Sequence, residues 1–194
     1  MIKYVILIPS FNDWECLNLL IPKIDHALKS TNENVDVLIV NDGSTKKNNL
    51  SFKKMACLKK IEILNLKKNV KAQIAIASGL EFLKEKNYEG GIIVMDADGQ
   101  DDPETLIPII EKVKIDPYNL ITINRITRKD NKIFITFYNL YLILTWLFLF
   151  RSMRFGVFSY IHSNSLISLL KDNHINYAYV GSIAKKIKKK NIIL

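Results

Sequence analysis

Short apolar runs alternate with longer amphipathic stretches along most of this chain. The runs have the length of β-strands, and the stretches between several of them have the length and apolar spacing of α-helices. Strands that alternate with helices indicate βαβ units and a mainly parallel sheet, hence an α/β fold. No repeat, linker or low-complexity segment divides residues 1–194, so a single domain is expected. The predicted strands are Tyr4 to Pro9, Val35 to Val40, Ile61 to Leu66, Ile92 to Met95 and Leu120 to Ile123, and the predicted helices are Trp14 to about Lys29, Ala72 to Lys86 and Pro103 to Lys114.

One segment departs from this alternation. Ile133 to Phe150 is intensely apolar and aromatic, yet it contains Thr136, Asn139 and Thr145. Its 18 residues are at the lower limit for a membrane-spanning helix, and its Tyr and Trp side chains prefer the membrane–water boundary. Three interpretations stay open: a buried core helix, a helix lying against the membrane surface, and a true span.

Basic residues exceed acidic ones by 28 to 19, which gives a formal net charge of +9. Five of the lysines crowd the end of the chain, between Lys185 and Lys190. Such an excess suits anionic partners, namely phosphorylated substrates, nucleic acid or an acidic membrane surface. Nucleic acid is not expected, because the sequence has no zinc-finger or RRM-like signature and its aromatic residues are not interleaved with lysines.

The cysteines and the N-terminus indicate a compartment. Cys16 and Cys57 have no CxxC spacing and no His-rich surroundings, so neither a disulfide framework nor a zinc site is indicated. The first apolar run is short and is interrupted by Pro9, unlike a secretory signal. We therefore expect a cytoplasmic protein, held peripherally on the cytoplasmic face of the membrane by its basic residues and apolar segment. Its oligomeric state is left open.

The most informative motif is MDADGQDDPE, Met95 to Glu104, which follows a predicted strand and leads into a helix opened by Pro103. Ligands of open α/β sheets bind beyond the carboxyl ends of the strands. Asp96 and Asp98, with Gln100 beyond them, form a hard oxygen-ligand set suited to Mg²⁺ or Mn²⁺. The alternative is that these residues form only a solvated turn and a helix N-terminus. An EF-hand is excluded, because its sixth and twelfth positions would lack the required Gly and Glu.

Three other predicted strands also end in polar segments. Ser10 to Asp13 can cap the following helix, whose free N–H groups also favour an anion. Asp42 begins an Asp-Gly pair of the kind common in turns, yet it is also placed to accept hydrogen bonds from a nucleobase or ribose. Arg125 and Arg128 offer guanidinium groups for phosphate. The absence of GxxxxGK[ST] and GxGxxG argues against a P-loop NTPase or a dinucleotide enzyme.

Taken in order, IPSFND, VNDGST, KNVKAQIAIASGL, MDADGQDDPE and NRITR resemble the motifs of family 2 glycosyltransferases of GT-A fold. Within that family the likeness is greatest to the polyprenyl-phosphate branch of dolichol-phosphate mannose synthase-like proteins. It extends from Lys3 to about Arg128 and, more loosely, over Gly156 to Leu170. The combination is specific, although each motif alone is not. The resemblance implies a Rossmann-like, mainly parallel sheet flanked by helices.

The resemblance also implies roles for individual positions. Phe11 and Asp13 stand where the family usually has Tyr and Glu, and Val70 replaces a common Gly in the NxGxxxA stretch. The positions implied to bind the nucleotide sugar are Pro9, Phe11, Asp13, Asp42, Lys71 and Asp96; those implied to bind metal are Asp96, Asp98 and Gln100; and those expected to act in catalysis are Asp98, Asp101, Asp102, Arg125 and Arg128.

The implied reaction is inverting transfer of a hexose from a UDP- or GDP-sugar, with Mg²⁺ or Mn²⁺ as cofactor. The expected acceptor is a polyprenyl (lipid) phosphate, which is largely dianionic at pH 7 and needs positioning more than deprotonation. One alternative is a sugar hydroxyl in cell-surface polysaccharide synthesis, for which a carboxylate such as Asp101 or Asp102 would serve as base. Another is a catalytically inactive nucleotide-sugar-binding homologue. Similar proteins continue beyond a comparable Lys-rich, Ile-rich stretch, so we expect the acceptor-side end to be truncated at Leu194.

Overall fold

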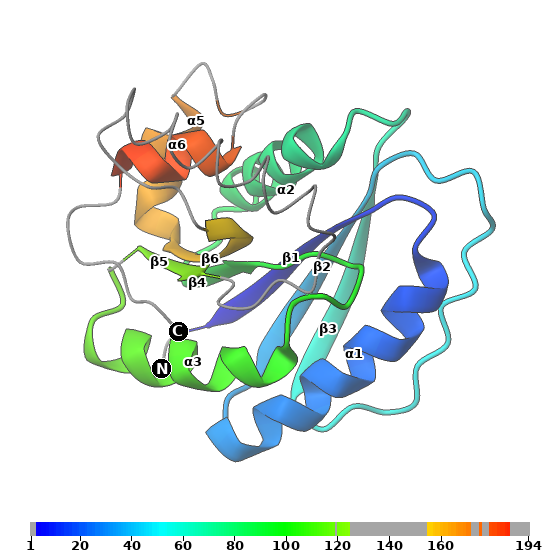
Figure 1. Cartoon of the computed structure of the whole chain (residues 1–194), viewed down its shortest axis with the longest axis horizontal. Coiled ribbons are helices and arrows are strands. Elements are labelled where there is room, and N and C mark those ends of the chain that lie inside the picture. The colour runs from blue at the N-terminus through cyan, green and yellow to red at the C-terminus, as the bar shows by residue number, and fades with distance from the viewer. Residues whose placement is uncertain (1–2, 119, 125–154, 172–174, 176–178, 187–194) are drawn as a thin grey trace, which may run out of the picture.

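One six-stranded sheet runs through the described part of the chain, residues 3–118, 120–124, 155–171, 175 and 179–186 of a computed structural model (Figure 1). The strands are β1 (Tyr4–Ser10), β2 (Val35–Asn41), β3 (Leu58–Asn65), β4 (Gly91–Val94), β5 (Ile121–Asn124) and β6 (Phe155–His162). The α-helices are α1 (Trp14–Leu28), α2 (Ala72–Glu85), α3 (Leu106–Ile115), α5 (Leu166–Leu170) and α6 (Tyr179–Lys186). The short 3₁₀ helices are η1 (Lys29–Thr31), η2 (Pro103–Thr105) and η3 (Ser163–Ser165).

The strands lie in the order β3-β2-β1-β4-β6-β5, and β6 runs antiparallel to both of its neighbours. From β1 the chain moves outwards to β2 and β3, and then returns through α2 to β4 on the other side of β1. The order reverses between β1 and β4, which is where open α/β sheets bind ligands. The predicted α/β fold, with a mainly parallel sheet flanked by helices, is confirmed. The five predicted strands are present, and β6 is an additional strand that the apolar pattern did not predict.

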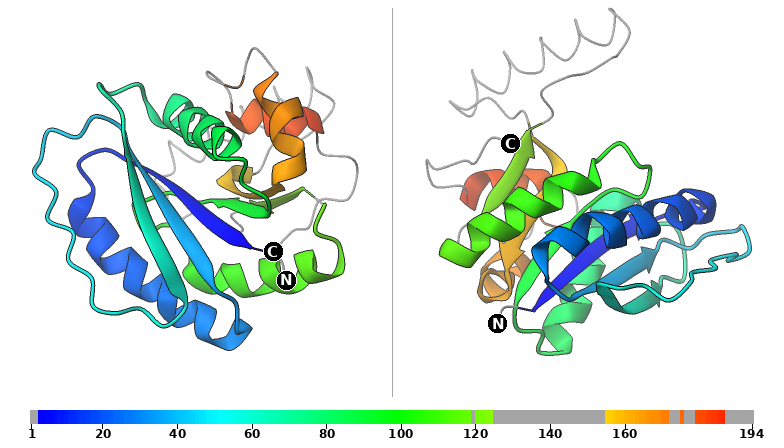
Figure 2. Two further views of the ribbon diagram at one scale, coloured as in Figure 1. Left: turned by 180° about the vertical axis from the view of Figure 1, so that it is seen from behind. Right: turned by 90° about the horizontal axis from the view of Figure 1, so that it is seen from below.

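Alternating side chains divide the core into two layers, one on each face of the sheet. In β1, Tyr4, Ile6 and Ile8 pack with residues of α1 and α3, whereas Val5 and Leu7 pack with residues of α2, α5 and α6. Both β1 and β4 are buried along their whole length, as parallel strands covered on two faces should be. Figures 1 and 2 show α1 and α3 below the sheet and α2, α5 and α6 above it.

Helix α2 approaches the sheet closely at Gly79. A Cβ at this position would lie 2.7 Å from Leu7 Cδ1 and 2.7 Å from Val40 Cγ2, so a larger residue would displace the helix. The close contact fixes α2 against β1 and β2. It therefore also fixes the N-terminus of α2, which begins at Ala72 beside the carboxyl ends of those strands.

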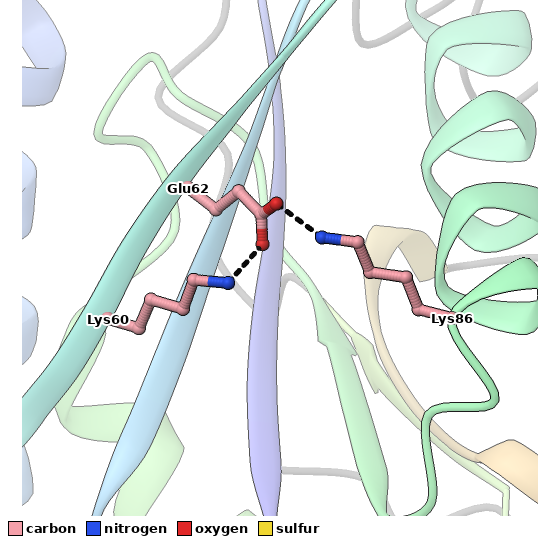
Figure 3. Close-up of polar contacts among 3 residues, drawn as sticks. All are labelled: Lys60, Glu62 and Lys86. Carbon is pink, nitrogen blue, oxygen red and sulfur yellow. Dashed lines mark hydrogen bonds and ion pairs between the residues drawn. The ribbon is translucent and has the colours of Figure 1, made fainter.

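The edge strand β3 is joined to the end of α2 by a cluster of charged side chains (Figure 3). Glu62 accepts a hydrogen bond from Lys60 Nζ at 2.7 Å, and its other oxygen pairs with Lys86. The hydrogen bonds from Lys60 and Lys86 hold the pKa of Glu62 below its ordinary value. Exposed ion pairs contribute little stability. Charges on an edge strand do, however, disfavour pairing with the edge of another chain.

The long segment between β2 and β3 lies along α1 (Figure 1) and is held by polar side chains of that helix. Trp14 Nε1 donates to the carbonyl oxygen of Lys46 at 3.0 Å, and Asn18 bonds the backbone of residues 49 and 51. Asp25, which is 6% exposed, accepts hydrogen bonds from the backbone N–H groups of residues 56–58 at 3.2, 2.8 and 3.1 Å. One face of α1 therefore orders a segment that has no regular structure of its own.

Among the helices that the structure describes, none is long and apolar enough to cross a membrane. The apolar segment Ile133 to Phe150 lies outside the described residues. Its three interpretations therefore stay open.

Candidate active site

The segments that follow β1, β2 and β4, together with the start of α2, surround an open cleft of about 260 Å³. Six of the nine lining residues were predicted from the sequence, and Ser10, Ala72 and Ala97 are the additions. The prediction drew these six from three separate strand ends, and the fold brings them to one place. The described residues that line the cleft are Pro9, Ser10, Phe11, Asp13, Asp42, Ala72, Asp96, Ala97 and Asp98.

The segment after β1 contributes an apolar and an acidic side chain to the cleft. Phe11 is 41% exposed, which leaves its ring available for stacking on a planar group such as a base. Asp13 stands at the N-cap position of α1 but makes no capping hydrogen bond, so the expectation that this side chain caps the helix is wrong. Its carboxylate instead accepts a hydrogen bond from the backbone N–H of Phe11 at 3.3 Å.

Asn12 joins the end of β1 to the end of β2, a role that the sequence analysis missed. Its backbone has φ 63°, a left-handed conformation that Asn adopts more readily than most residues. Its side-chain oxygen accepts hydrogen bonds from the N–H groups of Thr45 at 2.9 Å and Lys46 at 2.8 Å, and its own N–H donates to Ser44 Oγ at 2.8 Å. An Asn in a polar turn is too common a signal to have indicated this role.

Asp42 joins the end of β2 to the segment that leads into α2. It is 3% exposed, and its two carboxylate oxygens accept hydrogen bonds from the N–H groups of Val70 at 2.7 Å and Lys71 at 2.9 Å. The neighbouring Gly43 has φ +67°, and a Cβ there would lie 2.5 Å from the carbonyl carbon of Lys68. The chain can make this approach only with glycine. Each carboxylate oxygen retains a second acceptor direction, so Asp42 can also bind a ligand from the cleft.

Lys71 has a backbone conformation that glycine favours. Its φ is 75° and its ψ is 155°, a region that is almost restricted to Gly. The position whose backbone would suit a glycine is therefore Lys71. The sequence analysis had instead assigned the missing family glycine to Val70. The Lys71 side chain is exposed and forms no ion pair with the described residues.

The acidic motif after β4 is a turn shaped by its own carboxylates. Asp98 Oδ1 accepts a hydrogen bond from the N–H of Gln100 at 2.9 Å, and Gly99 between them has φ 76°. Asp101 is 5% exposed, and its Oδ2 accepts a hydrogen bond from the N–H of Asp96 at 3.1 Å. These bonds hold Asp96 and Asp98 at the edge of the cleft.

The other predicted residues of this motif lie elsewhere. Gln100, Asp101 and Asp102 are not among the residues that line the cleft. Asp102 accepts a hydrogen bond from the N–H of Glu104 at 3.1 Å and so caps η2, and it lines a separate groove beside His26 of α1. Asp101 therefore holds the backbone of a cleft residue without lining the cleft itself, and Asp102 caps η2.

Two predicted arginines and most of the basic end of the chain lie outside the described residues. Arg125 and Arg128 lie outside the described residues, as do the lysines from Lys188 onwards. Lys185 and Lys186 belong to α6, but their side chains are not described. Their predicted roles stay predictions.

The charges of the cleft favour a cation. Asp13, Asp42, Asp96 and Asp98 line it, and none of the described lining residues is a Lys or Arg. The described residues contain no group of three or more His, Cys, Asp or Glu side chains that could hold a metal ion. Mg²⁺, however, is usually bound by one or two carboxylates together with waters and substrate phosphates. Asp96 and Asp98 fit that pattern, in which the substrate completes the site.

One buried hydroxyl also lacks a partner in the cleft. Ser10 is 2% exposed, and its Oγ has no hydrogen-bond partner among the described residues. A buried polar atom without a partner is energetically unfavourable. Ser10 lines the same cleft as the four aspartates, so a polar ligand there could satisfy it.

Two features together are those of a GT-A fold. One is the strand order, with one antiparallel strand between β4 and β5, and the other is the aspartate-lined cleft at the carboxyl edge of the sheet. The family model described as Glycosyl transferase family 2 matches residues 5–172, and the chain belongs to this family. The polyprenyl-phosphate branch within it stays a prediction.

Two relatives share part of the sequence. The uncharacterized glycosyltransferase YkcC of Bacillus subtilis (strain 168) is 29% identical over 134 residues, which cover 69% of this chain and 40% of that protein. The uncharacterized glycosyltransferase sll0501 of Synechocystis sp. is 27% identical over 132 residues, which cover 66% of this chain and 39% of that protein. The matches thus span 40% and 39% of the relatives' own lengths.

Solved structures share the fold. TarS 1–349 of S. aureus aligns with a TM-score of 0.57 at 15% identity, over 99% of this chain and 58% of that one. The same protein in complex with UDP-GlcNAc aligns with a TM-score of 0.58 at 15% identity, over 99% of this chain and 56% of that one. At this identity the likeness establishes the GT-A fold.

Proposed function

We propose that this chain transfers a hexose from a UDP- or GDP-sugar to a lipid phosphate, with inversion at the anomeric carbon. The observation that carries the proposal is the single cleft into which separate strand ends bring Phe11, Asp42 and Asp98. Membership of glycosyl transferase family 2 supports the reaction class. A nucleotide-sugar donor is further supported by the structural neighbour TarS, which is described in complex with UDP-GlcNAc and with UDP.

In this proposal, different residues of the cleft contact different parts of the donor. Phe11 offers an apolar ring for the base, and Asp42 offers acceptor directions for base or ribose hydrogen bonds. Asp96 and Asp98 would hold Mg²⁺ or Mn²⁺ against the diphosphate. A bound ion of this kind stabilises the negative charge that develops on the leaving group. The hydrogen bond from Gln100 N–H to Asp98 orients that carboxylate before any ligand arrives.

A lipid phosphate is the acceptor that we favour in this proposal. A sugar hydroxyl must lose a proton during transfer, whereas a phosphate monoester is already largely dianionic at pH 7. Asp101 and Asp102, the carboxylates considered as a base, are engaged in the turn and in the cap of η2. A phosphate acceptor needs positioning by cations, for which Arg125 and Arg128 are the proposed groups.

Incubating the chain with a panel of UDP- and GDP-sugars and Mn²⁺ tests the proposal. Release of UDP or GDP is measured with and without a polyprenyl phosphate, and Asp98→Ala serves as the inactive comparison. Release that rises with the lipid phosphate supports the proposal. Release that rises only with a sugar acceptor identifies a hydroxyl-directed transferase. Tight donor binding with no release identifies a non-catalytic homologue, and neither binding nor release overturns the proposal.

A further inference from the structure

We infer that Lys71 binds the diphosphate of the donor, and that its strained backbone keeps a cation at the rim of an acidic cleft. The inference rests on the proposed donor binding. The family resemblance implied only that Lys71 binds the nucleotide sugar, and the inference names the diphosphate as the group it binds. The fold holds Lys71 in a backbone conformation that normally only glycine adopts.

The described non-glycine residues with positive φ fall into two kinds. Asn12, Asn32 and Asn87 have φ values of 63°, 55° and 51°, and Asn adopts the left-handed region more easily than other residues. Lys71 has φ 75° and ψ 155°, a combination that is essentially restricted to glycine. Strain of this kind persists only where the surroundings fix the backbone, and it clusters at functional sites.

Asp42 and α2 fix this backbone from both sides. Asp42 holds the N–H groups of Val70 and Lys71, and the carbonyl oxygen of Lys71 accepts the N–H of Ala75 at 3.0 Å as α2 begins. None of these bonds uses the Lys71 side chain, which is exposed and forms no ion pair with the described residues. A glycine would satisfy the same backbone without strain. The fold therefore gains nothing from a lysine at this position.

The charges of the cleft provide a role for Lys71. Lys71 lies between two features of its wall, since Ala72 lines the cleft and Asp42 accepts the Lys71 N–H. The wall carries four aspartates, and none of its described residues is a cation. A diphosphate is anionic, and a lysine provides a point charge on a long flexible stem. The unpartnered hydroxyl of Ser10 in the same cleft independently indicates that a polar ligand completes this site.

Four variants separate the charge from the strain. Lys71→Ala removes the ammonium group but leaves a side chain in the strained region, and Lys71→Gly removes both. Lys71→Arg keeps a positive charge. Asn87→Gly is the matched control, because it also replaces a positive-φ residue by glycine but lies after the far end of α2. Each variant is assayed for UDP and uridine binding by calorimetry with Mn²⁺, and for thermal unfolding without nucleotide.

Lys71→Ala and Lys71→Gly should each bind UDP about tenfold more weakly, the usual size of one charge-assisted contact. Their uridine affinity should match wild type, because uridine has no phosphate. Lys71→Gly alone of the two should raise Tm, by about 2–8 °C, since it relieves the strain. Lys71→Arg should retain most of the UDP affinity, and Asn87→Gly should leave it unchanged.

Three results would overturn the inference. They are wild-type UDP affinity in Lys71→Ala, an equal loss of UDP and uridine affinity in that variant, and a lower Tm in Lys71→Gly. A wild-type chain that binds neither UDP nor GDP overturns the donor proposal itself, and this inference with it. The two failures are therefore distinguishable.

Discussion

Single aspartates at the cleft act in the fold and are available to a ligand at the same time. Asp42 accepts two backbone N–H groups, and Asp98 accepts one, yet both line the cleft. A carboxylate has about four acceptor positions, so these bonds orient each side chain without exhausting it. The consequence is that a substitution at either residue changes local structure and ligand binding together, to different degrees.

Asp98→Ala should abolish the dependence of UDP or GDP binding on Mn²⁺. The loss of one charged ligand should weaken binding with Mn²⁺ at least about tenfold, because interactions with charged groups contribute about 1.5–3 kcal/mol. Calorimetry with and without the ion measures this. Asp102→Ala is the control, since Asp102 caps η2 and lies away from the cleft. Tight binding that ignores the ion in wild type, or that survives Asp98→Ala, contradicts a metal role for the motif.

Asp42→Ala should lower both the nucleotide affinity and the free energy of unfolding. Two backbone N–H groups lose a charged acceptor, so unfolding should become easier by about 2–4 kcal/mol. Asp42→Asn keeps one carbonyl acceptor and should lose less. Urea denaturation and nucleotide titration of the folded fraction separate the two effects. If stability falls while the folded fraction binds normally, Asp42 has a structural role alone.

The sequence predicted acidic and polar residues of the site better than the backbone that positions them. Asp42, Asp96 and Asp98 were predicted because polar residues directly follow apolar runs, and parallel strands end at one edge of the sheet. The role of Asp13 in binding the nucleotide sugar was implied only by the family resemblance. The family resemblance implied Lys71 as a position that binds the nucleotide sugar, but the role of Asn12 and the strained backbone of Lys71 depend on positive φ angles of 63° and 75°. Such angles result from tertiary contacts, here with the loop after β2 and with Asp42, which residue type alone does not reveal.

At the scale of elements, the apolar pattern predicted the strands whose position depends mainly on their own sequence. The strands β1, β2 and β4 are continuous apolar runs and were predicted, whereas β6 was not. Gly156 and Ser159 interrupt the apolar character of β6, and its place depends on pairing with β4 and β5, which are distant in sequence. The predicted helix from Pro103 begins instead with the 3₁₀ helix η2, and its α-helical part begins at Leu106.

Helix α1 orders the segment between β2 and β3, and Asp25 is the buried anchor of that contact. Asp25→Ala should lower the free energy of unfolding by about 2–4 kcal/mol, because three backbone N–H groups lose one charged acceptor. Asn18→Ala removes an exposed contact with the same segment and should lower it by less than about 1 kcal/mol. Chemical denaturation of both variants measures the difference. Equal losses would show that burial does not distinguish the two contacts.

The contribution of Asp25 should depend on pH in a definite direction. Burial raises the pKa of Asp25, but the three backbone hydrogen bonds and nearby Lys29 outweigh it and bring the pKa below the ordinary 3.8. The stabilisation is therefore fully present above about pH 3.8 and is lost as pH falls through the lower folded-state value. The difference in stability between wild type and Asp25→Ala should accordingly become smaller at strongly acidic pH. A difference that stays constant with pH would contradict the role of the charge.

At the scale of the whole molecule, charge and cleft are opposite in sign. The chain carries +9 overall, yet four aspartates line the cleft. A positive exterior attracts anionic donors and anionic surfaces over distances comparable to the Debye length, about 8 Å at physiological ionic strength. Inside the cleft the proposed anionic donor would then need a bound cation or Lys71. In this proposal the net positive charge acts while the donor approaches, and the charges of the cleft act once it is bound.

The last prediction is that the protein binds membrane surfaces without crossing them. Apolar helices gain membrane affinity from buried area, and each basic residue near an anionic surface adds about 1 kcal/mol. The chain should therefore co-sediment with anionic vesicles at low salt and be released at high salt. Replacing the five lysines between Lys185 and Lys190 by Gln should weaken binding more than replacing five exposed lysines of the β2–β3 region, namely Lys46, Lys47, Lys53, Lys54 and Lys59. Equal losses would assign the effect to net charge. Resistance of the bound protein to both salt and alkaline wash would identify Ile133 to Phe150 as a true span. If the protein binds neither anionic nor neutral vesicles, the segment is a core helix, and this result counts against a lipid acceptor.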